Sequence, residues 1–257
     1  GSVNFVGCLI GAVAADTVAA ARTAAALVDV TYDTTQQGEA VLTMDEAVAA
    51  GNILPAPPTQ PTMGIVRKGD TAAAFESAAQ VITGEICIGG QEHFYMEPFS
   101  FLVEPARPGA GDPLQLTLCS QALADNQRSV AAALGLGEHE VAVRARRLGG
   151  GFGGKAGNMN DLAAGVAIAA TLLRKPARAV LRREEDFALS GKRETLQGKY
   201  TVGINTDAKI VAFQLEILGN GGVAPARGTM IKGLMNGALS YGAVPNVRLD
   251  LTVVSSN

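Results

Sequence analysis

The chain has 257 residues, of which 47% are hydrophobic and 18% charged, a composition typical of a packed globular protein with one or two domains. Its formal net charge is -3 and its basic residues are scattered, which argues against nucleic acid or an anionic membrane surface as a partner. The apolar runs are too short for a membrane span and the start has no signal-peptide pattern, so we expect a cytoplasmic protein with no membrane contact.

In chain order, capping residues and apolar periodicity predict helices separated by short strands. The expected helices cover residues 16–27, 43–50, 70–79, 125–134 and 160–173. The expected strands cover residues 28–32, 80–88, 114–118, 141–146, 177–181, 199–204 and 209–218. This mixture predicts the α+β class.

Two local signals are clear. Thr43 and Glu46 form a capping box, and Gly51 ends that helix where a left-handed residue is wanted. Four prolines between residues 52 and 66 remove backbone donors and predict a linker. We therefore expect a domain boundary near residue 60.

Cysteine and histidine usage limits the metal chemistry. The three cysteines, Cys8, Cys87 and Cys119, are odd in number and widely spaced, which predicts buried thiols rather than a disulfide framework. The two histidines, His93 and His139, lack the spacing of a zinc or iron site held by the protein. Any metal is therefore expected to come with its own organic ligand.

The segment from Arg147 to Lys155 places five glycines around Phe152, and folding alone gives little reason for so many. Between an expected strand and an expected helix, such a backbone suits close approach of a ligand. Two nucleotide patterns fit only in part, because Ala156 stands where a Walker loop has a hydroxyl residue and no acidic residue follows at the dinucleotide spacing. Nucleotide binding and a tight packing turn both remain open at this point.

A second unusual segment, from Gly89 to Pro98, passes from two glycines directly to polar and aromatic residues. This pattern suits side chains that point into a cavity. Gln91 is the strongest candidate, because a neutral amide can donate to an oxygen ligand of an anionic cofactor without adding charge. The structural alternative is a satisfied pair of His93 and Glu97 at i and i+4, with the aromatic residues in the core.

Together these segments resemble the molybdenum hydroxylases, the family of xanthine dehydrogenase and aldehyde oxidase. The resemblance covers nearly the whole chain, and the matching motifs lie at residues 6–16, 89–97, 147–155, 183–186 and 244–248. It implies that residues 1–60 are the end of an α/β hammerhead domain. Residues 61–257 are then the first molybdenum cofactor-binding domain.

The resemblance also implies a chemistry. With a molybdenum-molybdopterin cofactor, the enzyme inserts water-derived oxygen at an electron-poor carbon of a purine, N-heterocycle or aldehyde. The 2Fe-2S clusters and FAD of other domains pass the electrons on to NAD or oxygen. In this scheme Gln91 donates a hydrogen bond to an oxygen ligand of molybdenum without ligating the metal, and the backbone at Phe152 and Gly153 lies against the cofactor.

Two substrate positions depart from the purine-oxidising pattern of the family. Ala156 stands where those members carry a glutamate, and Gly233 stands where an arginine assists purine binding. The substrate positions therefore lean towards aldehydes or other N-heterocycles, because a site without the polar partner rejects the purine. Glu194 also replaces a family histidine, so a non-catalytic binding or assembly relative is the alternative to an enzyme.

The resemblance stops just before a further family motif, Thr-Ala-Phe-Arg-Gly. We therefore expect a fragment whose general-base glutamate lies beyond Asn257, with no catalytic residue in this part. The fragment alone is expected to be inactive and to bind no cofactor. Its expected partners are the remainder of its own polypeptide or companion subunits and a small-molecule substrate, and the parent protein is expected to form homodimers.

Overall fold

The computed structural model describes residues 2–3, 5–35, 37–55, 64–106, 109, 111–157, 159–223, 237 and 242–256. The chain divides into two compact units, each made of two separate stretches of sequence. Unit 1 comprises Gly1–Gln36 and Glu92–Arg193, and unit 2 comprises Gln37–Gln91 and Glu194–Asn257. The boundary expected near residue 60 lies outside the described residues, so the division into residues 1–60 and 61–257 stays a prediction.

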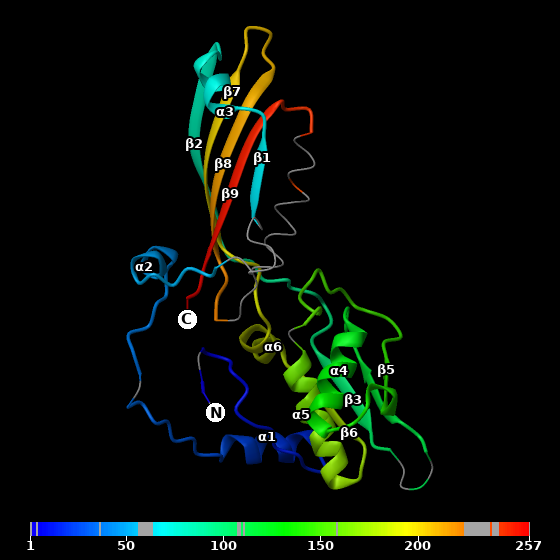
Figure 1. Ribbon diagram of the computed structural model, residues 1–257. Helices are drawn as coiled ribbons and strands as arrows, with labels where there is room; N and C mark the ends of the chain where they lie inside the picture. Colours follow the sequence, from blue (N-terminus) through cyan, green and yellow to red (C-terminus); the bar gives the residue numbers. More distant parts are fainter. Residues whose placement is uncertain are drawn as a thin grey trace. The chain divides into compact units, whose positions relative to one another are not determined.

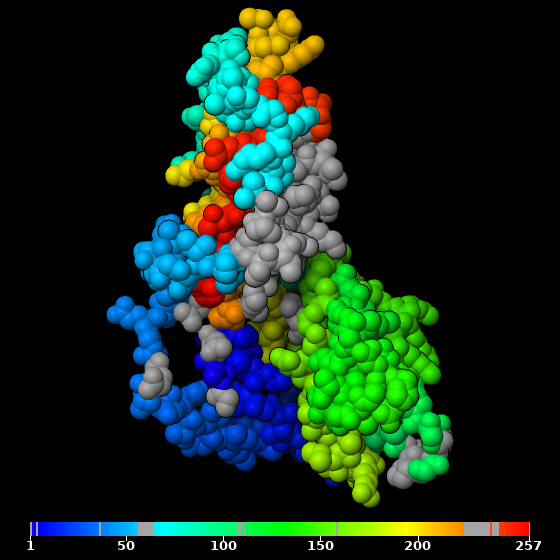
Figure 2. All heavy atoms as spheres, in the orientation of Figure 1, coloured from blue at the N-terminus to red at the C-terminus, as the bar shows by residue number. Residues whose placement is uncertain are grey.

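Unit 2 is built on a five-stranded mixed sheet with the strand order β1-β9-β8-β7-β2 (Figure 1). Its strands are β1 (Ile65–Lys68), β2 (Gln80–Ile88), β7 (Leu196–Ile204), β8 (Ile210–Asn220) and β9 (Asn246–Val254). Neighbouring strands are antiparallel except β8 and β9, which are parallel. The turn between β7 and β8 protrudes from one end of this sheet (Figure 2).

Two short helices pack against the sheet of unit 2. The first, α2 (Met44–Ala49), contacts β8 and β9, and the second, α3 (Thr71–Glu76), contacts β7, β8 and β9. The expected capping box of α2 is confirmed, because the Thr43 hydroxyl accepts from the Glu46 N–H and the Glu46 carboxylate accepts from the Thr43 N–H. Gly51 follows in the expected left-handed conformation, with φ 73°.

Unit 1 contains a four-stranded mixed sheet with the strand order β5-β4-β3-β6. Its strands are β3 (Ser100–Glu104), β4 (Leu114–Leu118), β5 (Val141–Arg144) and β6 (Ala177–Val180), and β4 and β5 are the parallel pair. The helices are α1 (Val18–Ala26), α4 (Leu123–Leu134), α5 (Asn160–Leu173) and α6 (Arg183–Leu189), with a 3-10 turn at Glu138–Glu140. Among these, α4 and α5 pack against each other and contact the sheet (Figure 1).

The core of unit 1 lies between its sheet and the helices α4 and α5. The three leucines of β4 are buried while the residues between them are half-buried, so one face of the strand points into this core. From α5, Ala163, Ala167 and Ala170 are fully buried at helical spacing, and their small side chains allow a close approach. This packing fixes the position of α5 and, with it, of the loop that precedes the helix.

The expected α+β class is confirmed, and so are α1, β2, β4, α4, α5 and the β7–β8 hairpin. Residues 28–32, all of them described, form no strand and are exposed, so their apolar alternation was misleading. The expected linker ends early, because Ile65 already pairs with Asp250 in the sheet. Of the cysteines only Cys119 is buried, whereas Cys87 is exposed. No helix in the described ranges is both long and apolar enough to cross a membrane.

Candidate functional site

The glycine loop, residues 147–155, lies in unit 1 between β5 and α5, and both of its ends are bound by Glu97. One carboxylate oxygen of Glu97 accepts from the Gly149 N–H at 2.8 Å and from the Lys155 ammonium at 2.9 Å. The Glu97 N–H donates to the Gly149 carbonyl at 3.2 Å. One residue therefore closes the loop by joining its start to its end.

Lys155 is fully buried, with a side-chain exposure of 0%, which is rare for a cation. Its ammonium nitrogen lies 2.9 Å from the Glu97 carboxylate and 4.5 Å from the ring centroid of Tyr95. A buried charge is tolerated only with partners of this kind. A Walker lysine must instead reach a phosphate, so this geometry does not fit the nucleotide hypothesis.

Tyr95 is held from its other side by a buried carboxylate. Its hydroxyl donates to Asp186 at 2.7 Å, and the same carboxylate accepts from the Phe99 N–H at 2.9 Å. Burial, and then the hydrogen bond and charge of Asp186, raise the pKa of the Tyr95 hydroxyl. Tyr95 therefore stays a neutral donor, and its hydrogen bond to Asp186 holds its ring in position beside the Lys155 ammonium.

The middle of the loop is bound by two further side chains. The Oε1 atom of Gln121 accepts from the Gly153 N–H at 3.0 Å and from the Lys155 N–H at 3.3 Å. The backbone N–H of Gln121 donates to the Lys155 carbonyl at 2.9 Å, and the Arg193 guanidinium donates to the Phe152 carbonyl at 2.8 Å. Side chains from outside the loop therefore set its backbone conformation.

Four of the five loop glycines are packed against the protein itself. A Cβ on Gly149 would lie 2.6 Å from the Cβ of Glu97, and a Cβ on Gly151 would lie 2.5 Å from the Cδ of Gln121. Any side chain there would displace the residues that hold the loop. The other two confined glycines are Gly150 and Gly154.

Gly153 is the exception. Its φ is +93°, and nothing lies within 4 Å of the place where a Cβ would be. Phe152 beside it has φ 50° and is 60% exposed, and Ala156 is exposed as well. The outward side of the loop therefore combines an aromatic ring with open backbone.

The comparisons with known proteins agree with this fold. Residues 56–257 match the family described as molybdopterin cofactor-binding domain. The chain belongs to this family. It is 39% identical over 222 residues to a xanthine dehydrogenase of Oryza sativa subsp. japonica, covering 86% of the chain and 16% of that protein. It is 37% identical over 241 residues to a probable aldehyde oxidase of Caenorhabditis elegans, covering 91% of the chain and 18% of that protein. The chain thus spans less than a fifth of the length of these relatives.

Solved structures share the fold of this cofactor-binding domain. The aldehyde oxidoreductase from Desulfovibrio gigas is 23% identical with a TM-score of 0.76, over 94% of this chain and 26% of that chain. Quinoline 2-oxidoreductase from Pseudomonas putida 86 is 22% identical with a TM-score of 0.77, over 94% of this chain and 31% of that chain. At these identities the likeness concerns the fold alone.

The structure brings together three of the residues predicted from the sequence. Phe152 and Gly153 of the glycine loop and Ala156 directly after it are all exposed, and all three belong to unit 1. Gln91 is exposed and is the last residue of the first stretch of unit 2, so its role at this loop stays a prediction. Gly233 lies outside the described residues.

Three residues that hold the loop were missed as such by sequence reasoning. Glu97 was considered only in the structural alternative, as a partner of His93, and its carboxylate accepts from the Gly149 N–H and the Lys155 ammonium. Gln121 and Arg193 contact the loop from 32 and 41 residues away, distances at which no helical or strand period operates. One available signal was Lys155 itself, because a lysine in a glycine-rich segment needs a carboxylate partner when it is buried.

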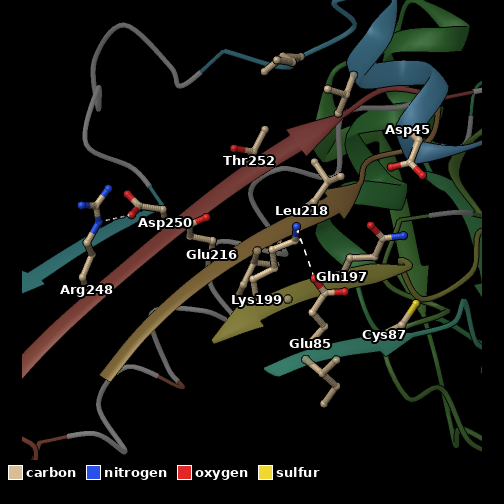
Figure 3. A pocket seen from close by; sticks show the side chains of 15 residues that line it. Asp45, Glu85, Cys87, Gln197, Lys199, Glu216, Leu218, Arg248, Asp250 and Thr252 are labelled. Atoms are coloured by element: carbon tan, nitrogen blue, oxygen red, sulfur yellow. Dashed lines mark hydrogen bonds and ion pairs between the residues drawn. The ribbon is translucent and has the colours of Figure 1, made fainter. Parts of the chain in front are cut away.

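Unit 2 has a hollow of its own, with a volume of about 830 Å³, on the face of the five-stranded sheet. Four of its charged side chains form pairs: Lys199 lies 3.5 Å from Glu85, and the Arg248 Nε donates to Asp250 at 2.8 Å (Figure 3). None of the described residues predicted for cofactor or substrate lines this hollow. The glycine loop of unit 1 is therefore the better candidate site.

Proposed function

We propose that the chain is the part of a molybdenum hydroxylase, of xanthine dehydrogenase or aldehyde oxidase type, that contacts the molybdopterin cofactor through Phe152 and Gly153. Membership of the cofactor-binding family supports the proposal. The observation that carries it is the open space beside Gly153, the one loop glycine that packing within the protein does not explain.

The loop suits an organic group that approaches its backbone. Among the described residues, no atom lies within 4 Å of the Cβ position of Gly153, which leaves room for a flat group to contact the main chain there. The Phe152 ring stands exposed beside it and offers an apolar surface. The bonds from Glu97 and Gln121 hold the backbone in place, so little ordering is left for the moment of binding.

When bound, the molybdenum group supplies the redox chemistry that puts water-derived oxygen on an electron-poor carbon of the substrate. In this proposal the residues of the chain bind and orient. Gln91 donates a neutral hydrogen bond to an oxygen on the metal. Gly153 gives the cofactor access to the backbone, and the Phe152 ring keeps water away from the cofactor. The 2Fe-2S clusters, FAD, companion domains and homodimer implied by the resemblance belong to the same proposal.

Loss of cofactor from a Gly153 variant tests the proposed contact. We expect Gly153→Ala, in the intact protein, to retain less than half of the molybdenum and pterin found in Gly135→Ala, measured by metal analysis and pterin fluorescence. Gly135 is a matched control, because its φ is +67° and nothing lies within 4 Å of its Cβ position. Both variants therefore place an alanine at positive φ, and Gly153→Ala, at +93°, carries the larger backbone strain, so the unfolding free energies of both variants are measured beside their cofactor contents. Equal cofactor contents would contradict a contact at Gly153.

The substrate class follows from Ala156 in this proposal. An exposed alanine has no polar group with which to pair a purine, although the relatives include xanthine dehydrogenases. We expect kcat/KM for an aromatic aldehyde to exceed that for xanthine by at least about tenfold, when both are assayed on the same preparation. A preference for xanthine would contradict the assignment of Ala156 while leaving the hydroxylase proposal intact.

A non-catalytic relative is the second candidate, and the packed glycines favour it. Gly149 and Gly151 are explained by Glu97 and Gln121 without any ligand, so most of the loop also fits a tight packing turn. Ala156 and Glu194 are consistent with this alternative. An intact wild-type protein that is well folded but contains no molybdopterin would support the alternative and overturn the enzyme proposal.

A further inference from the structure

The peptide group between Phe152 and Gly153 is held at both of its polar atoms. Its carbonyl oxygen accepts from Arg193 at 2.8 Å, and its N–H donates to Oε1 of Gln121 at 3.0 Å. Because these atoms belong to one planar unit, the two bonds together oppose rotation of the whole peptide. The residues on both sides have positive φ, 50° and 93°, a conformation that Phe152 adopts only when its surroundings impose it.

Gln121 is itself held in place by the loop. Its Oε1 atom accepts a second bond from the Lys155 N–H at 3.3 Å, and its backbone N–H donates to the Lys155 carbonyl at 2.9 Å. The Cα of Gly151 lies against its carboxamide, where an added Cβ would come within 2.5 Å of Cδ. Only a glycine at position 151 leaves room for this arrangement.

The side chains of Gln121 and Arg193 are both exposed, so the strength of their hydrogen bonds to this peptide depends on whether a ligand covers the loop. The hydrogen bonds of Gln121 and Arg193 to the peptide are exposed, so water competes for the same polar atoms. A ligand that excludes water there strengthens both bonds, because electrostatic interactions grow as the local dielectric falls. We therefore expect these two hydrogen bonds to be stronger under a bound group than in the free protein.

We propose that Gln121 and Arg193 are positioning residues, a clamp that presents the Phe152 ring and the open backbone of Gly153 to the cofactor in one conformation. This inference rests on the proposed function. Neither side chain is assigned a contact with reacting atoms. Without the clamp the peptide can flip, which reverses its dipole and moves the Phe152 carbonyl to the side now occupied by the Gly153 N–H.

Amide hydrogen exchange in the intact protein tests whether the clamp exists, whatever the function. In Gln121→Leu we expect exchange at Gly153 and Lys155 to rise about tenfold, because one acceptor is lost. Gln121→Glu keeps an acceptor oxygen and should remain near wild type. Gly151→Ala should reproduce the rise by displacing the carboxamide, whereas Gly157→Ala, with nothing within 4 Å of its Cβ position, should not. Unchanged exchange in Gln121→Leu would overturn the clamp.

The electron paramagnetic resonance spectrum of molybdenum(V) in the intact, cofactor-loaded protein tests the positioning role. We expect Gln121→Leu and Arg193→Met to shift this spectrum and to lower kcat about tenfold with KM little changed, and Gln121→Glu to restore both. Faster amide exchange together with an unchanged molybdenum(V) spectrum would show that Gln121 and Arg193 hold the peptide but do not position it against the cofactor. If the wild-type protein holds no molybdopterin, the proposed function and the positioning role fall together, while faster exchange still establishes the clamp.

Discussion

Replacing Gln91 with alanine in the intact protein is expected to lower turnover about 100-fold, the usual cost of removing one aligned donor to a developing oxyanion. In the proposed site the carboxamide donates to an oxygen on the metal and adds no charge to an anionic cofactor. The molybdenum content should stay at the wild-type level, because one hydrogen bond contributes little to retention of a large cofactor. Steady-state kinetics normalised to molybdenum content measures the effect.

Two further variants sharpen the Gln91 test. Gln80→Ala is the matched control, because Gln80 is an exposed glutamine at the opposite end of β2, the strand that leads to Gln91. It should leave turnover unchanged. Gln91→Glu keeps the side-chain shape but replaces the donor by a carboxylate, so its turnover should fall at least as far as that of the alanine variant. Full turnover in Gln91→Ala with normal molybdenum loading would contradict the proposed hydrogen bond from Gln91 to an oxygen on the metal.

Local patterns were enough for elements whose signals lie within a few residues. The capping box of Thr43 and Glu46 and the alternation of β4 were both readable from neighbouring positions. The same alternation is present in β9, where Val247 and Leu249 are buried, but no strand was predicted there. The apolar alternation at residues 28–32 predicts a strand equally well, but there the chain is exposed. Alternation becomes a strand only where a partner strand and a covered face are available.

At the candidate site, the sequence predicts which residues face outward but not what packs against the other glycines. The outward residues Phe152 and Gly153 were found from the glycine pattern and the family resemblance. The reason for the other glycines was expected to be cofactor space, and the structure gives a different one: at Gly149 and Gly151 the space is filled by Glu97 and Gln121. A glycine pattern shows that something approaches the backbone closely. It does not show whether that neighbour is a ligand or a side chain distant in sequence.

Glu97→Leu is expected to lower the free energy of unfolding by about 3 kcal/mol, because it leaves the ammonium of Lys155 buried without its counter-charge. This value is at the low end for a broken buried pair, since the Glu97 side chain is 36% exposed. Glu184→Leu is the control: its carboxylate, 65% exposed in a pair with Arg182, should contribute less than about 1 kcal/mol. Denaturant titration at neutral pH measures both, and similar losses in the two variants would contradict the role of Glu97.

The pH dependence separates lost charge from lost packing at Glu97. Burial alone raises the pKa of this carboxyl, but the hydrogen bond from Gly149 and the hydrogen bond and charge of Lys155 outweigh it and hold the pKa below the ordinary 4.5. The unfolded chain therefore binds the proton at a higher pH than the folded protein. The stabilisation is present above the ordinary pKa and is lost as the pH falls through the folded value.

The stability gap between wild type and Glu97→Leu should therefore narrow as the pH is lowered below about 4.5, the ordinary value for this carboxyl. A gap that stays constant with pH would assign the loss to packing instead. Adding Lys155→Met to Glu97→Leu should recover part of the loss at neutral pH, because the stranded cation is removed together with its partner. Recovery in the double variant would show that the charges of Glu97 and Lys155 compensate each other in the folded protein, so that the pair stabilises the closed loop in which Gly153 alone has an open Cβ position.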